Sequence, residues 1–161
     1  MTAADPTMAA LTAAVERGRA GDRLGARERL AELWRQVGPA GDPLHRVTVA
    51  HFLADLQDDV RDELAWDERA LADVAELTDE RTARFDPGMQ VRGFLPSLQL
   101  SVADCHRRLG DPVAARRHLA EAEQLVHVLA DDDYGRLIRA ALTQIRDALD
   151  EGSTDLLRAA P

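Results

Sequence analysis

Apolar residues recur along most of this chain at the three- and four-residue spacing of amphipathic helices. The first stripe contains Met8, Leu11 and Val15, and similar stripes follow at intervals to Leu149. The pattern predicts seven helices separated by short breaks. They cover about residues 6–20, 23–37, 43–56, 60–77, 95–109, 112–129 and 134–151.

The predicted boundaries coincide with recognisable start and stop signals. An Asp-Pro pair begins the helices at residues 5–6, 42–43 and 111–112. Proline suits the first helical position, and the aspartate before it can accept from the first free amides. Gly21, Gly110 and Gly152 follow the last apolar residues of three helices, where glycine commonly ends them. These signals favour an all-α fold.

One internal segment departs from the helical pattern. Residues 79–95 contain Pro87, Gly88 and Gly93, and Asp86-Pro87-Gly88 is typical of a turn. We expect an irregular insertion here that forms a mobile flap, with Thr78 able to cap a short extra turn. The domain prediction is one helical domain over residues 1–152, followed by a flexible tail at 153–161.

Composition removes several classes of function. The net charge of −9 opposes nonspecific nucleic-acid binding, which needs basic surface to neutralise phosphates. All 20 basic residues are arginine, so lysine chemistry such as a Schiff base or a P-loop is excluded. No apolar run approaches the ~18 residues of a membrane span, so no membrane association is expected.

The predicted compartment is the cytoplasm. The single cysteine, Cys105, cannot form an internal disulfide, which fits a reducing environment. The N-terminus lacks the basic start and apolar core of a secretory signal. Cys105 lies on the apolar stripe of its helix, and we interpret it as an inert core thiol.

The chain contains an internal repeat. Gly21-Asp22 and Gly110-Asp111 are each followed at the same offsets by an identical set of residues. These are Ala26 and Ala115, Arg27 and Arg116, Leu30 and Leu119, Ala31 and Ala120, and Glu32 and Glu121. A weaker copy starts at residue 58 and is the second of three along the chain, so the starts of successive copies are 37 and 52 residues apart.

Helical hairpins that recur at ~34 residues are the signature of tetratricopeptide repeats. Over about residues 6–150 the chain resembles that family, through Leu109-Gly110-Asp111 and the small residues Ala115 and Ala122. The resemblance implies a right-handed α-α superhelix of about three hairpins plus a C-terminal capping helix. It also implies a protein- or peptide-binding scaffold whose partner lies in the concave groove. The oligomeric state stays open.

The second copy breaks the repeat with polar residues. Glu63 stands where the other copies have alanine, and Asp67 interrupts the apolar series of its helix. His51 and Asp55 share one face of the preceding helix, because they are four residues apart. One register turns His51 toward Glu63. The other makes Val49, Ala50 and Leu53 the packing positions and turns His51 and Asp55 toward the groove, and we favour this one.

Three interpretations of these residues remain open. A structural network would pair His51 or an arginine with the two buried carboxylates. A binding site would use His51, Asp55, Glu63 and Asp67, with Arg92 from the insertion holding an anionic group. A metal or acid–base site is a third possibility, although the H-E-x-x-H arrangement is absent. We therefore assign no catalytic residue, metal ligand or cofactor, and leave open a small-molecule-binding protein or enzyme as the alternative.

The remaining polar clusters suggest solvation rather than chemistry. His106 and His118 lie beside an arginine-rich set, Arg107, Arg108, Arg116 and Arg117. Blocks of like charge are usually solvated helix faces, so we expect these arginines at the surface.

Overall fold

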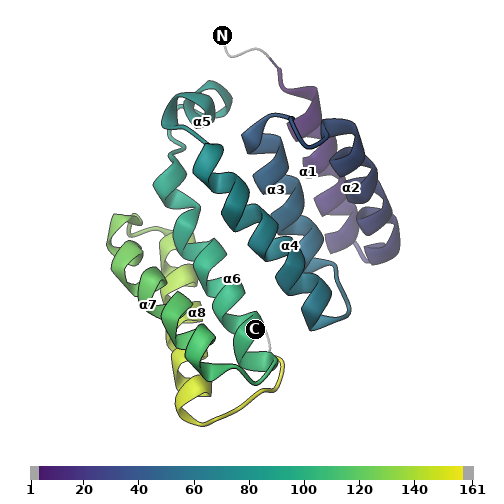
Figure 1. Ribbon diagram of the computed structural model, residues 1–161. Coiled ribbons are helices and arrows are strands. Elements are labelled where there is room, and N and C mark those ends of the chain that lie inside the picture. Colours follow the sequence, from purple (N-terminus) through teal and green to yellow (C-terminus); the bar gives the residue numbers. More distant parts are fainter. Residues whose placement is uncertain (1–3, 158–161) are drawn as a thin grey trace. The chain divides into compact units, whose positions relative to one another are not determined.

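The computed structural model describes residues 4–157 and is all-helical, which confirms the predicted all-α class. Within these residues there are eight α-helices and no strands (Figure 1). The helices are α1 (Pro6–Arg19), α2 (Arg23–Val37), α3 (Pro43–Asp55), α4 (Val60–Asp73), α5 (Asp79–Phe85), α6 (Leu95–Arg108), α7 (Pro112–Leu125) and α8 (Asp133–Asp150). Three short 3-10 turns, η1 (Val74–Glu76), η2 (Val91–Gly93) and η3 (Val126–Val128), complete the order.

The contacts divide the chain into two compact units, Met1–Val91 and Arg92–Pro161. The single domain predicted over residues 1–152 stays a prediction. No helix in the described part of either unit combines the length and the apolar character that crossing a membrane requires.

Aspartate side chains begin six of the eight helices, and the Asp-Pro and Gly-Asp signals indicate four of them. Each accepts a hydrogen bond from a backbone N–H of the first turn, and the six residues are Asp5, Asp22, Asp42, Asp59, Asp111 and Asp132. Each carboxylate satisfies an amide that has no partner inside the helix. This explains why the boundaries could be predicted closely.

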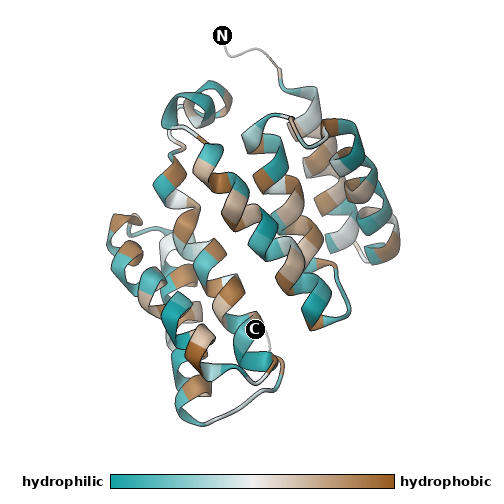
Figure 2. Cartoon of the chain, in the orientation of Figure 1, coloured by the Kyte–Doolittle hydropathy of each residue, from teal (hydrophilic) through white to brown (hydrophobic). Residues whose placement is uncertain are grey.

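The first unit consists of two helical hairpins followed by α5. Helix α1 packs on α2, α2 on α3 and α3 on α4. The core between them is aliphatic, and its largest members are almost fully buried: Leu11, Leu30, Leu44, Val47, Val49 and Leu53. Figure 2 shows apolar residues distributed along these helices among hydrophilic ones, as amphipathic packing requires.

Two indole rings join the second helices of these hairpins. Trp34 of α2 and Trp66 of α4 meet edge to face, with ring centroids 5.1 Å apart. Arg46 lies over Trp34 and Arg69 over Trp66, at 4.2 and 4.4 Å from the ring centroids. The arrangement adds cation–π attraction to ordinary burial.

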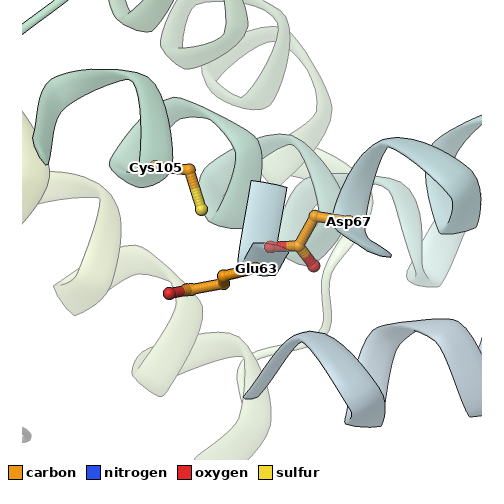
Figure 3. Close-up of side chains that lie close together, drawn as sticks. All are labelled: Glu63, Asp67 and Cys105. Atoms are coloured by element: carbon orange, nitrogen blue, oxygen red, sulfur yellow. The ribbon is translucent and has the colours of Figure 1, made fainter. Parts of the chain in front are cut away.

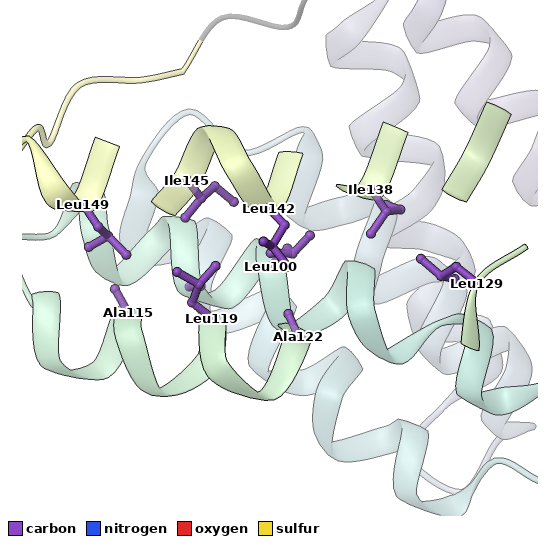
Figure 4. Close-up of a cluster of buried hydrophobic side chains, with 10 residues drawn as sticks. Leu100, Ala115, Leu119, Ala122, Leu129, Ile138, Leu142, Ile145 and Leu149 are labelled. Carbon is purple, nitrogen blue, oxygen red and sulfur yellow. The ribbon is translucent and has the colours of Figure 1, made fainter. Parts of the chain in front are cut away.

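The second unit is built from α6, α7 and α8, which pack on one another around an aliphatic cluster (Figure 4). Leu100 of α6, Leu119 of α7 and Leu142 of α8 belong to this cluster. Its other members are Ala103, Ala115, Ala122, Leu129, Ile138, Ile145 and Leu149. Helix α8 thus covers the apolar face of the α6–α7 hairpin.

The segment expected to be irregular contains an additional helix. Helix α5 occupies Asp79–Phe85, so the count of seven helices was wrong by one. The capping role foreseen for Thr78 is confirmed, because its hydroxyl accepts from the Arg81 N–H at 3.1 Å. Arg81 then donates to Asp5 and Asp42, at 3.0 and 2.6 Å. The start of α5 is therefore connected to the starts of α1 and α3.

Arg107 corrects the prediction of a solvated arginine cluster. It is 2% exposed and pairs with Asp104, and it also donates to the carbonyl oxygens of Ser153 and Asp155, at 2.7 Å each. These bonds fasten the segment after α8 to α6, and Leu157 packs against the aliphatic cluster. The first part of the predicted tail is thus held, and residues 158–161 lie outside the described residues.

Candidate functional site

Four of the five predicted site residues belong to the α3–α4 hairpin. His51 and Asp55 lie one turn apart on α3, and Glu63 and Asp67 lie one turn apart on α4. Figure 3 shows the two acidic side chains projecting from successive turns of α4. Since α3 and α4 pack against each other, the two pairs of polar residues belong to the same helical hairpin.

The centre of the cluster is the pair His51 and Asp67. The His51 Nδ1 and the Asp67 Oδ1 are 3.7 Å apart, a distance longer than a direct hydrogen bond. Asp67 is 1% exposed, which confirms its predicted inward orientation. Val49, Ala50 and Leu53 are fully buried, as the favoured register requires, and His51 is half-buried beside them.

Burial and charge shift both pKa values in this pair. Burial raises the pKa of Asp67 from 3.8 to about 6, although His51 opposes the change, and Asp55 and Glu63 add to it. Burial would lower the pKa of His51, but Asp67 and Asp55 outweigh it and raise that pKa above 6.5. A carboxyl and an imidazole that titrate in the same range share their protons as a pair.

Asp55 links the cluster to the molecular surface. It ends α3 and is exposed, yet the surrounding groups remove enough water to raise its pKa. His51 opposes this increase in the Asp55 pKa, whereas Glu63 reinforces it. His51 thus lowers the pKa values of both Asp55 and Asp67, and Glu63 raises them.

Arg92 is the one predicted site residue that does not belong to the α3–α4 hairpin. It is exposed in η2, at the start of the second unit. Its predicted role as an anion-holding residue for the His51 cluster stays a prediction.

A surface cavity of about 230 Å³ lies between α1 and α3. Its lining is apolar at Val15, Phe52 and Leu56 and charged at Arg19 and Asp55, and it also includes Gly18 and Arg23. Of the predicted site residues, only Asp55 lines it. Phe52 connects the two features, because its ring lies 5.6 Å from the His51 ring.

The two arginines of this cavity were missed by the sequence reasoning. They flank Gly21-Asp22, which was interpreted as a helix break and as the start of the first repeat copy, not as part of a site. Arg23 donates to the carbonyl oxygens of Asp55 and Gln57, at 3.2 and 3.0 Å. It thereby joins the start of α2 to the end of α3, and no one-dimensional pattern reports such a contact.

Two further cavities occur in the first unit. One of about 480 Å³ is lined by the α2–α3 loop together with Arg46, Asp73 and Glu76. Its arginine is already engaged by Trp34, by the Gly38 carbonyl oxygen at 2.6 Å and by Asp73 at 3.2 Å. The other, of about 140 Å³, includes His45 and Asp42. Neither cavity includes a predicted site residue.

The other chemically suggestive residues have structural partners. The rings of His106 and His118 stack 5.5 Å apart, and Gln99 Oε1 lies 2.8 Å from His118 Nδ1. Cys105 is buried, as expected for a core thiol. The stacking and the Gln99 contact give the two histidines structural roles.

Comparison of the chain with protein-family models, with curated proteins and with solved structures gives no match in any of the three.

Proposed function

We propose that this protein is a tetratricopeptide-like scaffold that binds a peptide or protein segment at α1 and α3, the first helices of the two hairpins in its first unit. Support comes from the turns at Gly21-Asp22 and Gly110-Asp111. In both, glycine has a positive φ and the aspartate caps the next helix. Both are followed by an alanine that is completely buried, Ala26 or Ala115. Such small residues allow the close helix crossings of this architecture, and the single cysteine favours a cytoplasmic location.

The observation that carries the binding role is the cavity between α1 and α3. At about 230 Å³ it is smaller than the ~300–1,000 Å³ pockets that enclose drug-sized ligands. Such a space suits one apolar side chain of a larger partner. Apolar anchors surrounded by polar contacts are the usual pattern when a segment docks in a helical groove.

A second candidate is a small-molecule-binding protein or enzyme that uses His51, Asp55, Glu63 and Asp67. The observation that favours it is the pKa of Asp67, raised to about 6, because titratable groups of this kind gather at catalytic sites. Structural ion networks shift pKa values in the same way, so we rank it second.

Selection of peptides on the intact chain tests the scaffold. Peptides from a random display library should bind, and their amide chemical-shift changes should map to residues around Val15, Phe52 and Leu56. Phe52→Ala should weaken binding while the helical circular dichroism is retained. Leu24→Ala is the matched control, because Leu24 is an exposed apolar residue outside the cavity lining. Binding that maps elsewhere, or equal losses in both variants, would contradict the proposal.

Elemental analysis separates the two candidates. The scaffold predicts no stoichiometric transition metal, and a folded His51→Ala protein whose main defect is weaker partner binding. About one zinc, iron or manganese per chain, lost in His51→Ala, would support the alternative, because residues of a metal or catalytic centre act as a unit.

A further inference from the structure

The rim of the α1–α3 cavity carries a cation that has no protein partner among residues 4–157. Arg19 is exposed in the last turn of α1 and forms no hydrogen bond or ion pair with the described residues. The positive charge of Arg19 acts on Asp55 at a distance and opposes the increase in the pKa of that carboxyl. Its guanidinium donors are therefore available to a ligand that enters the cavity.

The neighbouring cations are already compensated. Arg23 lies 3.6 Å from Asp58 and also binds the two carbonyl oxygens at the end of α3. Arg27 donates to the same Asp58 at 3.1 Å. The negative charge of Asp55 is partly balanced by His51 within the polar cluster. Among the charged residues that line the cavity, Arg19 is therefore the one most available to form an ion pair with a partner.

The apolar lining specifies the other half of the partner. Val15, Phe52 and Leu56 supply the apolar part of the cavity, and Gly18 leaves room because it has no side chain. A built Cβ at Gly18 would lie 3.7 Å from Leu56 Cδ2 and 3.1 Å from Ala26 Cβ. A side chain in this cavity would meet an apolar surface directly beside a guanidinium.

We infer that the segment bound here is acidic and amphipathic, with one apolar side chain in the α1–α3 cavity and an aspartate or glutamate carboxylate on Arg19. This inference rests on the proposed scaffold function. Guanidinium and carboxylate groups match in geometry and can form two parallel hydrogen bonds. The preference is local, because a net charge of −9 repels acidic ligands from the chain as a whole.

Three sets of short fluorescent peptides test the inference on the intact chain. All share a central Leu or Phe, and their flanking residues are Asp and Glu, Ser and Asn, or Lys and Arg. We expect the acidic set to bind about tenfold more tightly than the neutral set in fluorescence polarisation at low salt. The advantage should shrink between about 0.05 and 0.2 M salt, because exposed charges are screened.

Arg19→Glu should abolish the acidic preference and Arg19→Gln should reduce it. The matched control is Arg35→Glu. Arg35 is likewise an exposed arginine in the last turn of its helix, has no partner among the described residues and lies outside the cavity lining. The two charge reversals change the net charge equally, so only a local contact can make them differ.

The outcomes separate this inference from the proposed function. Binding of all three sets with equal affinity, or a basic preference, would leave the scaffold standing and overturn the acidic partner. An acidic preference that Arg19→Glu and Arg35→Glu alter equally would also overturn it. If no set binds, the scaffold function itself fails, and the inference fails with it.

Discussion

The hairpins α1–α2 and α6–α7 differ from α3–α4 at the same positions of their common repeat. In α2 and α7 the helix-crossing position is Ala26 or Ala115, and one turn later it is Leu30 or Leu119. In α4 these positions are Glu63 and Asp67. Leu30, Leu119 and Asp67 are 0%, 4% and 1% exposed. This position of the repeat is therefore buried in all three copies, although the residue differs. In the second copy a carboxylate occupies it.

The comparison shows that one hairpin holds a polar cluster at positions where the other two hold small and aliphatic residues. A buried carboxylate needs compensation, because desolvating a charge is costly. In α3–α4, His51 contributes to that compensation, and the pKa of Asp67 is nevertheless raised to about 6. Ionisation of Asp67 above a pH of about 6 therefore lowers the stability of the folded state.

The largest expected effect comes from moving the aspartate into the other copies. Leu30→Asp and Leu119→Asp would each bury a carboxylate in an aliphatic environment. We expect losses of about 4 kcal/mol or more in the free energy of unfolding, enough to unfold the affected unit. Circular dichroism during urea titration measures this loss.

Leu30→Ala and Leu119→Ala serve as controls, because they remove volume without adding charge and should cost about 2–5 kcal/mol. The charge contribution is read as the difference between Asp and Ala at each position, measured above pH 7. Equal stabilities of the Asp and Ala variants would show that these positions tolerate ionisation, and would contradict the contrast with α4.

Removing the carboxylate from its own hairpin should cost less. Asp67→Ala takes away the acidic partner of His51 and leaves a small void, so we expect a loss on the order of 1–3 kcal/mol. Glu68→Ala is the matched control, because it removes an exposed carboxylate from the next position of α4 and should stay within about 0.5 kcal/mol. An unchanged melting temperature in Asp67→Ala would mean that Asp67 makes no net contribution.

Much of the fold could be predicted from the sequence because its signals are local. Asp-Pro pairs, Gly-Asp turns and apolar stripes are written within a few residues of the boundaries that they set. Asp67 was also predictable, since its place in an apolar stripe implies burial. The repeat alignment also singles out the second copy, because Glu63 and Asp67 replace the alanine and leucine of the other copies.

The missed features depend on distant residues. Helix α5 has seven residues, too few for a periodic stripe, and its first turn is held by Arg81 through Asp5 and Asp42. Arg107 was assigned to the surface because its partners, the Ser153 and Asp155 carbonyl oxygens, lie more than forty positions away. The α1–α3 cavity likewise appears only once two separate helices are placed side by side.

A smaller effect, specific to the second hairpin, is expected on changing the pH. Between the ordinary pKa of 3.8 and about 6, the native state binds more protons at Asp67 than the unfolded state does. The raised pKa of His51 extends this excess above pH 6.5. Stability should therefore rise by about 1–2 kcal/mol as the pH falls from about 8 to about 5. Asp5, whose pKa is lowered, loses its contribution only below this window.

Urea unfolding at several pH values measures this change, and Asp67→Asn is the control. The amide keeps the shape of the side chain but cannot ionise, so the increase in stability toward pH 5 should become smaller. A wild-type protein that loses stability steadily from pH 8 to pH 5 would contradict the pairing of His51 with Asp67.

The smallest expected effect concerns the turns that precede the second helices. The first and third copies each contain a Schellman motif. The Asp22 N–H donates to the Arg17 carbonyl oxygen, and the Asp111 N–H donates to the His106 carbonyl oxygen. The intervening Gly21 and Gly110 have φ of +109° and +78°. The second copy has Asp58 instead of glycine, and no non-glycine residue in 4–157 has a positive φ. Its turn is therefore built differently.

Gly110→Ala and Gly21→Ala should each lower the free energy of unfolding by about 1 kcal/mol, because alanine is strained at positive φ. A built Cβ meets nothing within 4 Å at either position, so the loss would be conformational rather than steric. Gly93→Ala is the matched control, since its surroundings are equally open and its φ is not positive. It should stay within about 0.5 kcal/mol of the wild type. Equal effects of all three substitutions in urea titrations would show that backbone handedness does not distinguish the glycine turns from that of the second copy.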